Sequence, residues 1–94
     1  MQIELVEVGA RDGLQNESAS LATGDKIGLI ERVASAGIRR VEVASFVHPK
    51  LVPQMADAES VVGALPENDA VSYIGLVLNR RGLERALATS VDEI

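Results

Sequence analysis

Short runs of β-branched and apolar residues alternate along this chain with helix-like segments, and this alternation restricts the fold more than any other feature. We read strands in residues 2–8, 38–45 and 70–78, the last nearly continuous in apolar side chains. Strands joined through helices run parallel, because each crossover returns the chain to its starting edge. The order predicts an α/β fold, either the first three to four β/α units of a TIM (β/α)8 barrel or half of a doubly wound sheet.

The expected helices are bounded by residues that favour helix ends. The first begins at Thr23, a candidate N-cap, and ends at Gly37 in the manner of a left-handed C-cap. Its apolar stripe consists of Ile27, Ile30, Val33 and Ala34. Shorter helices are expected over 57–65 and 82–89, and residues 91–94 resemble the start of a fourth strand.

Two long irregular stretches, 9–24 and 46–56, follow the first two expected strands. Pro49 and Pro53 exclude a regular helix through the second. Active sites of parallel α/β folds lie at the carboxyl ends of the strands, and long loops in compact domains are more often functional than idle. The chemistry is therefore expected in these two loops and directly after the third strand.

Three β/α units cannot close a barrel, so they leave two sheet edges without partners. The chain stops at Ile94, inside an expected strand. We therefore expect residues 1–94 to be the amino-terminal part of a single TIM-barrel domain without a second domain. The alternative is a short chain whose exposed sheet edges are covered by a partner or by self-association.

Composition excludes several functions. Nine Lys and Arg against fourteen Asp and Glu give a net charge of −5, which argues against nucleic acid or an anionic membrane as partner. The absence of cysteine excludes a disulfide scaffold, a thiolate zinc site and a cysteine nucleophile within this chain. There is no Gly-x-Gly-x-x-Gly and no phosphate-binding loop with Gly-Lys-Ser/Thr. With no basic, apolar leader at residues 1–4, we expect a cytoplasmic, soluble chain.

Charged residues at the ends and interiors of the expected strands are the candidates for chemistry. Asp12 is a suitable oxygen ligand for a hard cation, and Arg11 can hold a carboxylate or polarise a carbonyl; the alternative is an ordinary Arg–Asp loop pair. Glu42 lies inside a parallel strand, where a carboxylate needs a compensating cation unless the strand is an edge. For Glu4 and Glu7 we favour exposure to solvent.

The remaining candidates are weaker. His48 is the single histidine and sits beside a proline, which favours a role in loop structure, and Lys50 is expected to be solvated. Asn79, at the end of the third strand, suits a substrate hydrogen bond and a helix cap equally well. Arg80 and Arg81 are expected to be a solvated helix start.

Two long motifs resemble a known family. Residues 6–17 read VEVGARDGLQNE, and residues 41–57 read VEVASFVHPKLVPQMAD. Both are similar to the first- and second-strand signatures of hydroxymethylglutaryl-CoA lyases, in the DRE-TIM metallolyase superfamily. Related isopropylmalate and homocitrate synthases share the Arg-Asp-Gly core but typically lack the Leu-Gln-Asn-Glu and Ser-Phe-Val-x-Pro-Lys continuations.

The resemblance implies a TIM barrel that cleaves 3-hydroxy-3-methylglutaryl-CoA to acetyl-CoA and acetoacetate with a divalent cation, magnesium or manganese. By this resemblance Asp12 is a metal ligand that also handles the proton of the tertiary hydroxyl. Arg11 stabilises the thioester oxygen, and Glu42 helps hold Arg11 and the substrate. The implied further substrate contacts are Gln15, Ser45 and Asn79. Alternatives are a related acyl-CoA lyase or condensing enzyme, and a non-catalytic association module.

The chain departs from the family pattern at one residue, and it does not include the later strands of the barrel. Ala10 stands where the family usually has proline. The remaining metal ligands, a His-x-His pair and an Asn, and a lid cysteine belong to later strands and lie outside this chain.

Because Asp12 alone cannot hold a cation usefully, we expect the 94-residue chain by itself to be inactive. Incubation with 3-hydroxy-3-methylglutaryl-CoA and magnesium should release no acetoacetate. Measurable turnover would contradict this expectation.

Overall fold

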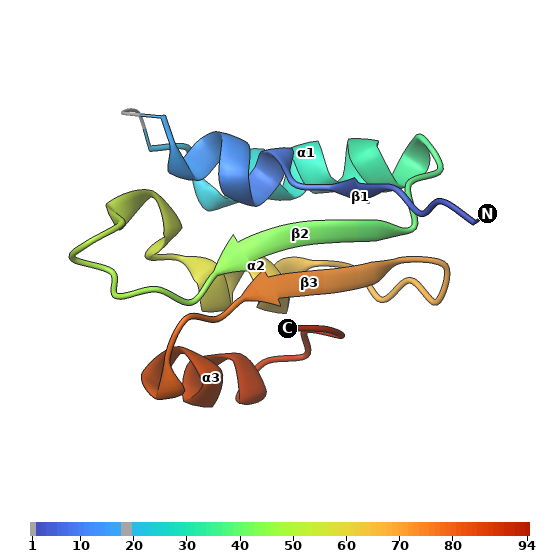
Figure 1. The fold of residues 1–94 in the computed structure, drawn as a ribbon. Coiled ribbons are helices and arrows are strands. Elements are labelled where there is room, and N and C mark those ends of the chain that lie inside the picture. The colour runs from blue at the N-terminus through green and yellow to red at the C-terminus, as the bar shows by residue number, and fades with distance from the viewer. Residues whose placement is uncertain (1, 18–19) are drawn as a thin grey trace.

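The structure is a computed structural model that describes residues 2–17 and 20–94, and its strands form one parallel sheet in the order β1-β2-β3 (Figure 1). Helices connect consecutive strands, so the predicted parallel α/β arrangement is confirmed. The main elements are β1 (Val6–Glu7), α1 (Thr23–Ser35), β2 (Arg40–Ser45), α2 (Ala58–Ala64), β3 (Ser72–Leu76) and α3 (Arg80–Leu87). Two short helical turns are η1 (Gly9–Gly13), of the π type, and η2 (Pro53–Met55), of the 3-10 type.

The first and fourth expected strands are much shorter than the sequence predicts, and the third covers Ser72–Leu76 instead of residues 70–78. β1 pairs with β2 only through Val6 with Arg40 and Glu7 with Val41, while residues 2–5 are exposed and lack a neighbouring strand among the described residues. At the other edge, the predicted fourth strand is a single parallel bridge between Ile74 and Glu93. An extended segment pairs as a β-strand only where a second backbone satisfies its N–H and C=O groups. The apolar pattern therefore overestimated the lengths of these strands.

Helix ends lie within two residues of the predictions: α2 covers 58–64 where 57–65 was expected, and α3 covers 80–87 where 82–89 was expected. Gly37 has the expected left-handed backbone, with φ at 95°. Thr23 is not the N-cap, because Ala22 holds that position; Thr23 instead donates its Oγ1 hydrogen to Asp57 Oδ2 at 2.6 Å. The expected irregular stretch 9–24 contains η1, whose polar sequence has no apolar period that would reveal it. No helix within 2–17 and 20–94 combines the length and apolarity needed to cross a membrane.

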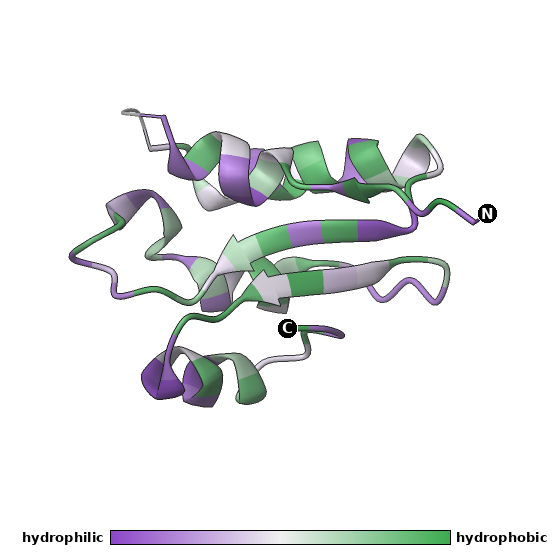
Figure 2. Cartoon of the chain, in the orientation of Figure 1, coloured by the Kyte–Doolittle hydropathy of each residue, from purple (hydrophilic) through white to green (hydrophobic). Residues whose placement is uncertain are grey.

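The core lies between the sheet and its helices. Apolar and polar residues alternate along β2, as Figure 2 shows, and Val41 and Val43 are almost fully buried. They share a core cluster with Ile30 of α1 and Val61 of α2. Glu42 lies between these valines in the sequence and therefore points to the other face of the sheet. This alternation leaves a carboxylate on the face away from the apolar core.

Phe46 follows β2 directly and packs where β3 carries a glycine. The Phe46 ring is 1% exposed, and a Cβ built on Gly75 would lie 2.6 Å from its Cε2 atom. A second glycine, Gly82 in α3, lies under the Phe46 carbonyl, since a Cβ there would be 2.5 Å from that oxygen. The close approach of three elements around Phe46 therefore depends on the absence of two side chains.

Gly75→Ala should destabilise the chain by about 1–3 kcal/mol, because the added methyl overpacks a site already filled by the Phe46 ring. Gly63→Ala is the matched control: Gly63 is exposed in α2, and an added methyl would meet nothing within 4 Å, so alanine should stabilise by about 0.5–1 kcal/mol. Urea unfolding of the two variants measures both changes. Equal free energies of unfolding for Gly75→Ala and the unsubstituted chain would contradict the packing described here.

Candidate functional site

The carboxyl ends of the three strands point to the same edge of the sheet. In Figure 1 the arrowheads share one direction, and η1, the 46–57 loop and the start of α3 lie beyond them. The predicted site residues belong to these segments, to β2 itself or, for Gln15, to the stretch that follows η1. The topology therefore brings together, at one edge, segments that the sequence separates.

The turn η1 presents Arg11 and Asp12 next to the end of β1. Its backbone is held by the Val8 carbonyl, which accepts hydrogen bonds from the N–H groups of Arg11 at 3.1 Å and Asp12 at 2.7 Å. Glu7 adds a further tie, since its Oε1 accepts from the Gly9 N–H at 2.8 Å. Turns of the π type occur frequently at functional sites. Glu7 is thus half-buried with a structural contact, whereas Glu4 is exposed as expected.

Arg11, Asp12 and Glu42 are in contact. Arg11 Nε donates to Glu42 Oε1, and Arg11 Nη1 lies 3.3 Å from Asp12 Oδ1. The side chains of Arg11 and Glu42 are each 16% exposed, whereas that of Asp12 is 53% exposed. A carboxylate in a strand is costly to bury without a cation, and Arg11 supplies that cation. The alternative in which Glu42 faces solvent on an edge strand is therefore wrong.

Asp12 combines a fixed backbone with an accessible carboxylate. The Asn16 side-chain amide donates to the Asp12 carbonyl at 2.8 Å and lies 3.5 Å from its Oδ1. A carboxylate of this kind can give one oxygen to a hard cation. Within the described residues, no group of three His, Cys, Asp or Glu side chains is placed to bind a metal. The role of Asp12 as a metal ligand therefore stays a prediction.

Two polar atoms near this edge are buried and lack hydrogen-bond partners within the described chain: Gln15 Oε1 and Ser45 Oγ. Ser45 is 0% exposed at the end of β2, and Gln15 follows η1. Burial of a polar group without a partner costs about 1–3 kcal/mol, so such atoms commonly mark positions where a ligand or water binds. Both residues are among the substrate contacts expected from the sequence.

The other candidates have structural contacts. Asn79 is the N-cap of α3, with its Oδ1 accepting from the Gly82 N–H at 2.8 Å; its expected contact with substrate stays a prediction. His48 is exposed, and its Nδ1 accepts from the Lys50 N–H at 3.1 Å, which confirms a role in loop structure. Arg80 and Arg81 are solvated, at 92% and 82% exposed.

A buried lysine behind the site was not predicted from the sequence. Lys26 of α1 is only 3% exposed, and its Nζ donates to Asp57 Oδ1 at 2.5 Å and to the Gln54 carbonyl. Burial by itself raises the pKa of Asp57, but the hydrogen bonds from Lys26 and Thr23 outweigh it and hold that pKa below its ordinary value. Lysine is usually exposed in an amphipathic helix, so only its placement in space reveals this pair.

A third ion pair supports the 46–57 loop from α3. Arg85 donates to both carboxylate oxygens of Glu59, at 2.7 and 2.6 Å, and to the Val47 carbonyl at 2.8 Å. Its guanidinium lies 5.7 Å from the centre of the Phe46 ring. The hydrogen bond from Arg85 keeps the pKa of Glu59 below its ordinary value. A hollow of about 370 Å³ beside this pair is also lined by His48 and Asn79.

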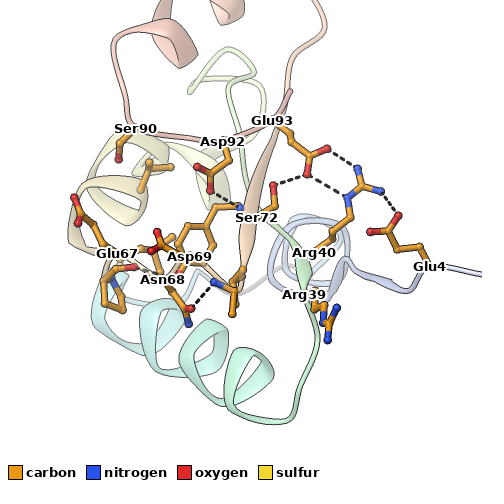
Figure 3. Close-up of a pocket in the computed structure, with 16 residues that line it drawn as sticks. Glu4, Arg39, Arg40, Glu67, Asn68, Asp69, Ser72, Ser90, Asp92 and Glu93 are labelled. Carbon is orange, nitrogen blue, oxygen red and sulfur yellow. Dashed lines mark hydrogen bonds and ion pairs between the residues drawn. The ribbon is translucent and has the colours of Figure 1, made fainter.

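A second and larger hollow, about 890 Å³, lies at the opposite, amino-terminal ends of the strands (Figure 3). Part of its polar lining is paired: Arg40 Nη2 lies 2.6 Å from Glu93 Oε1, and Ser72 donates to the same carboxylate. The hydrogen bond from Arg40 lowers the pKa of Glu93. Neither hollow is lined by Arg11, Asp12 or Glu42. Parallel sheets place their chemistry at the carboxyl ends of the strands, and the larger hollow lies at the amino-terminal ends. The size of a hollow is thus a poor guide to the site here.

Comparisons with known proteins find relatives that are similar over nearly the whole of this chain. The chain is 46% identical over 92 residues to hydroxymethylglutaryl-CoA lyase of Pseudomonas mevalonii, covering 98% of this chain and 31% of the relative. It is 44% identical over 93 residues to a 3-hydroxy-3-isohexenylglutaryl-CoA/hydroxymethylglutaryl-CoA lyase of Pseudomonas aeruginosa, covering 99% and 31%. The crystal structure of the lyase from Brucella melitensis matches with a TM-score of 0.94 and 49% identity over 98% of this chain and 32% of that one.

The predicted resemblance to hydroxymethylglutaryl-CoA lyases is therefore confirmed, and this chain spans about 31% of the length of the curated relatives it matches. The similar proteins include a mouse lyase named as mitochondrial and a rat lyase named as cytoplasmic. No protein-family model matches the chain.

A double-mutant cycle should detect the Arg11–Glu42 pair. Arg11→Met, Glu42→Gln and the double variant should give a coupling free energy of about 1–3 kcal/mol, because both partners are largely buried. Arg80→Met with Glu84→Gln is the control cycle: that pair is 92% and 56% exposed, and its coupling should stay below about 0.5 kcal/mol. Urea unfolding gives both values. Similar coupling in the two cycles would mean that burial adds nothing to the Arg11–Glu42 pair.

Proposed function

We propose that this chain, which matches about 31% of the length of hydroxymethylglutaryl-CoA lyases, forms the amino-terminal part of a carbon–carbon lyase of that kind. The enzyme would cleave 3-hydroxy-3-methylglutaryl-CoA to acetyl-CoA and acetoacetate. In this proposal residues 1–94 belong to one TIM-barrel catalytic domain.

The observation that carries the proposal is the contact of Arg11 with Glu42 and Asp12 at the carboxyl edge of the sheet. Glu42 fixes the guanidinium of Arg11 from one side, so its remaining N–H groups have a defined direction. Asp12 keeps an accessible carboxylate beside that cation. A fixed cation next to a fixed base is the arrangement that such a cleavage requires.

Cleavage of the carbon–carbon bond requires two events on the substrate. The tertiary hydroxyl must lose its proton, and the departing carbon must pass its electron pair into the thioester carbonyl. The enolate formed in this way then takes up a proton to give acetyl-CoA. In this proposal Asp12 would accept the proton, in the role of a general base. Arg11 would stabilise negative charge on the thioester oxygen as the enolate develops.

The partnerless atoms of Gln15 and Ser45 supply a binding role in the same proposal. Substrate polar groups would satisfy Gln15 Oε1 and Ser45 Oγ, which find no partner in the described chain. Binding of substrate would then replace two unfavourable buried atoms with hydrogen bonds. Asn79 is proposed as a further substrate contact through its side-chain Nδ2 group, because its Oδ1 already accepts the capping hydrogen bond.

A divalent cation, magnesium or manganese, fits this site through Asp12 as one ligand, with the remaining ligands outside this chain. When bound, such a cation would supply Lewis-acid chemistry toward the substrate oxygens. The carboxylate of Asp12 is the type of oxygen donor that these ions prefer.

The acyl group and the location are open to a narrower proposal. The name of the relative from Pseudomonas aeruginosa includes a longer 3-hydroxy acyl-CoA as well as the methyl one, which supports a related acyl-CoA as the alternative substrate. We propose a cytoplasmic location, in line with the rat relative that is named as cytoplasmic.

A second candidate role is self-association through the β1 edge, where Ile3 and Leu5 are 81% and 69% exposed.

A chimera tests the function. The matching segment of the Pseudomonas mevalonii lyase would be replaced by this chain, and the chimera should cleave 3-hydroxy-3-methylglutaryl-CoA. Within it, Arg11→Met should lower kcat by about 10²–10³-fold, because a preorganised cation is lost at the developing oxyanion. Arg80→Met, which removes the same charge from an exposed position, should leave kcat unchanged. A folded chimera without turnover, or one indifferent to Arg11→Met, would overturn the proposal.

A further inference from the structure

The buried cation of α1 is not explained by the chemistry proposed for the site. Lys26 is 3% exposed, and burying an ammonium group is costly unless it is paired and hydrogen-bonded. A lysine at this position could be replaced by an apolar residue of similar length if the core alone had to be filled. The burial of this charge therefore directs attention to what the contacts of Lys26 hold together.

The contacts of Lys26 join the far ends of two loops. The loop after β1 ends where α1 begins, and Lys26 and Thr23 both lie in the first turns of that helix. The loop after β2 ends at Gln54 and Asp57, which receive hydrogen bonds from Lys26 and, for Asp57, from Thr23. One carboxylate and one carbonyl of the second loop are thus bound to the end of the first.

A second link continues from this cluster toward the site. The Gln54 side chain donates through Nε2 to the Glu17 carbonyl at 2.6 Å, in the middle of the first loop. One residue earlier, Asn16 donates to the Asp12 carbonyl at 2.8 Å. A continuous path of hydrogen bonds and short chain segments therefore runs from Lys26 through Gln54 and Glu17 to Asp12.

We propose that Lys26 is a positioning residue, which fixes the loop bearing Arg11 and Asp12 relative to the loop that follows Ser45. It touches neither substrate nor cation in this proposal, and it acts through Gln54 and Asp57. The catalytic consequence rests on the proposed function, whereas the mechanical coupling of the two loops does not.

Amide hydrogen exchange of this chain tests the coupling. Lys26→Met keeps the length of the side chain but removes its charge and donors, so amides in both loops should exchange about tenfold faster through local opening. The amides to follow are those of Asn16, Glu17, Met55 and Ala56, which have backbone acceptors in these loops. Arg32→Met is the matched control, because it removes a cation from an exposed position of the same helix.

A second variant keeps the test valid if Lys26→Met unfolds the chain. Gln54→Ala removes the link to Glu17 and leaves the Lys26–Asp57 pair in place, so it should speed exchange at Asn16 and Glu17 but not at Met55 and Ala56. Where the double variant folds, it should exchange at Asn16 and Glu17 no faster than Lys26→Met alone, since both act along one path. The proposal would be overturned if the exchange rates in the double variant rose by the product of the two single effects. It would also be overturned if Gln54→Ala left the exchange of Asn16 and Glu17 unchanged.

Kinetics in the chimera separate the two proposals. Lys26→Met should lower kcat by about 10–10²-fold, because small displacements of catalytic groups are costly, while KM changes little. Lys26→Arg keeps a cation that can donate to Asp57 and Gln54, so it should recover part of the lost kcat. An inactive unsubstituted chimera would count against the proposed function only, because the exchange experiment still decides the coupling. Normal kcat in Lys26→Met would overturn the positioning role.

Discussion

The ion pair between Arg11 and Glu42 organises the whole site. Glu42 lies on β2 between two buried valines, so its carboxylate faces a sheet surface where an isolated charge would be unfavourable. Arg11 provides the compensating charge from η1, and it lies 31 positions earlier in the chain. The pair thereby fixes the loop after β1 onto β2, and Asp12 is carried into place with it.

Two further ion pairs hold the surrounding loops by the same principle. Lys26 and Asp57 are also 31 positions apart and join α1 to the start of α2, while Arg85 of α3 binds Glu59 of α2. Each pair links neighbouring β/α units, whose apolar contacts lie deeper in the core. The edge that carries the site is therefore organised by charge pairs, and the layer below it by valine, isoleucine and phenylalanine.

The parts of the fold that the sequence predicts well are those with local causes. The apolar run of β3 and the left-handed Gly37 each follow from properties of a few neighbouring residues. The predictions failed where a partner decides the structure. The first strand was expected over seven residues but forms only at Val6 and Glu7, where β2 lies alongside, and η1 has no apolar period that marks it.

The parallel β/α order, the adjacency of Arg11 and Asp12, and the similarity to hydroxymethylglutaryl-CoA lyases can all be read from the amino-acid sequence, because periodicity and motifs are local properties. The pairing of Glu42 with Arg11, the burial of Lys26 and the partnerless hydroxyl of Ser45 become visible only in the folded chain. Burial and charge pairing depend on residues from distant parts of the chain, and their energies are set by the low-dielectric surroundings that folding creates.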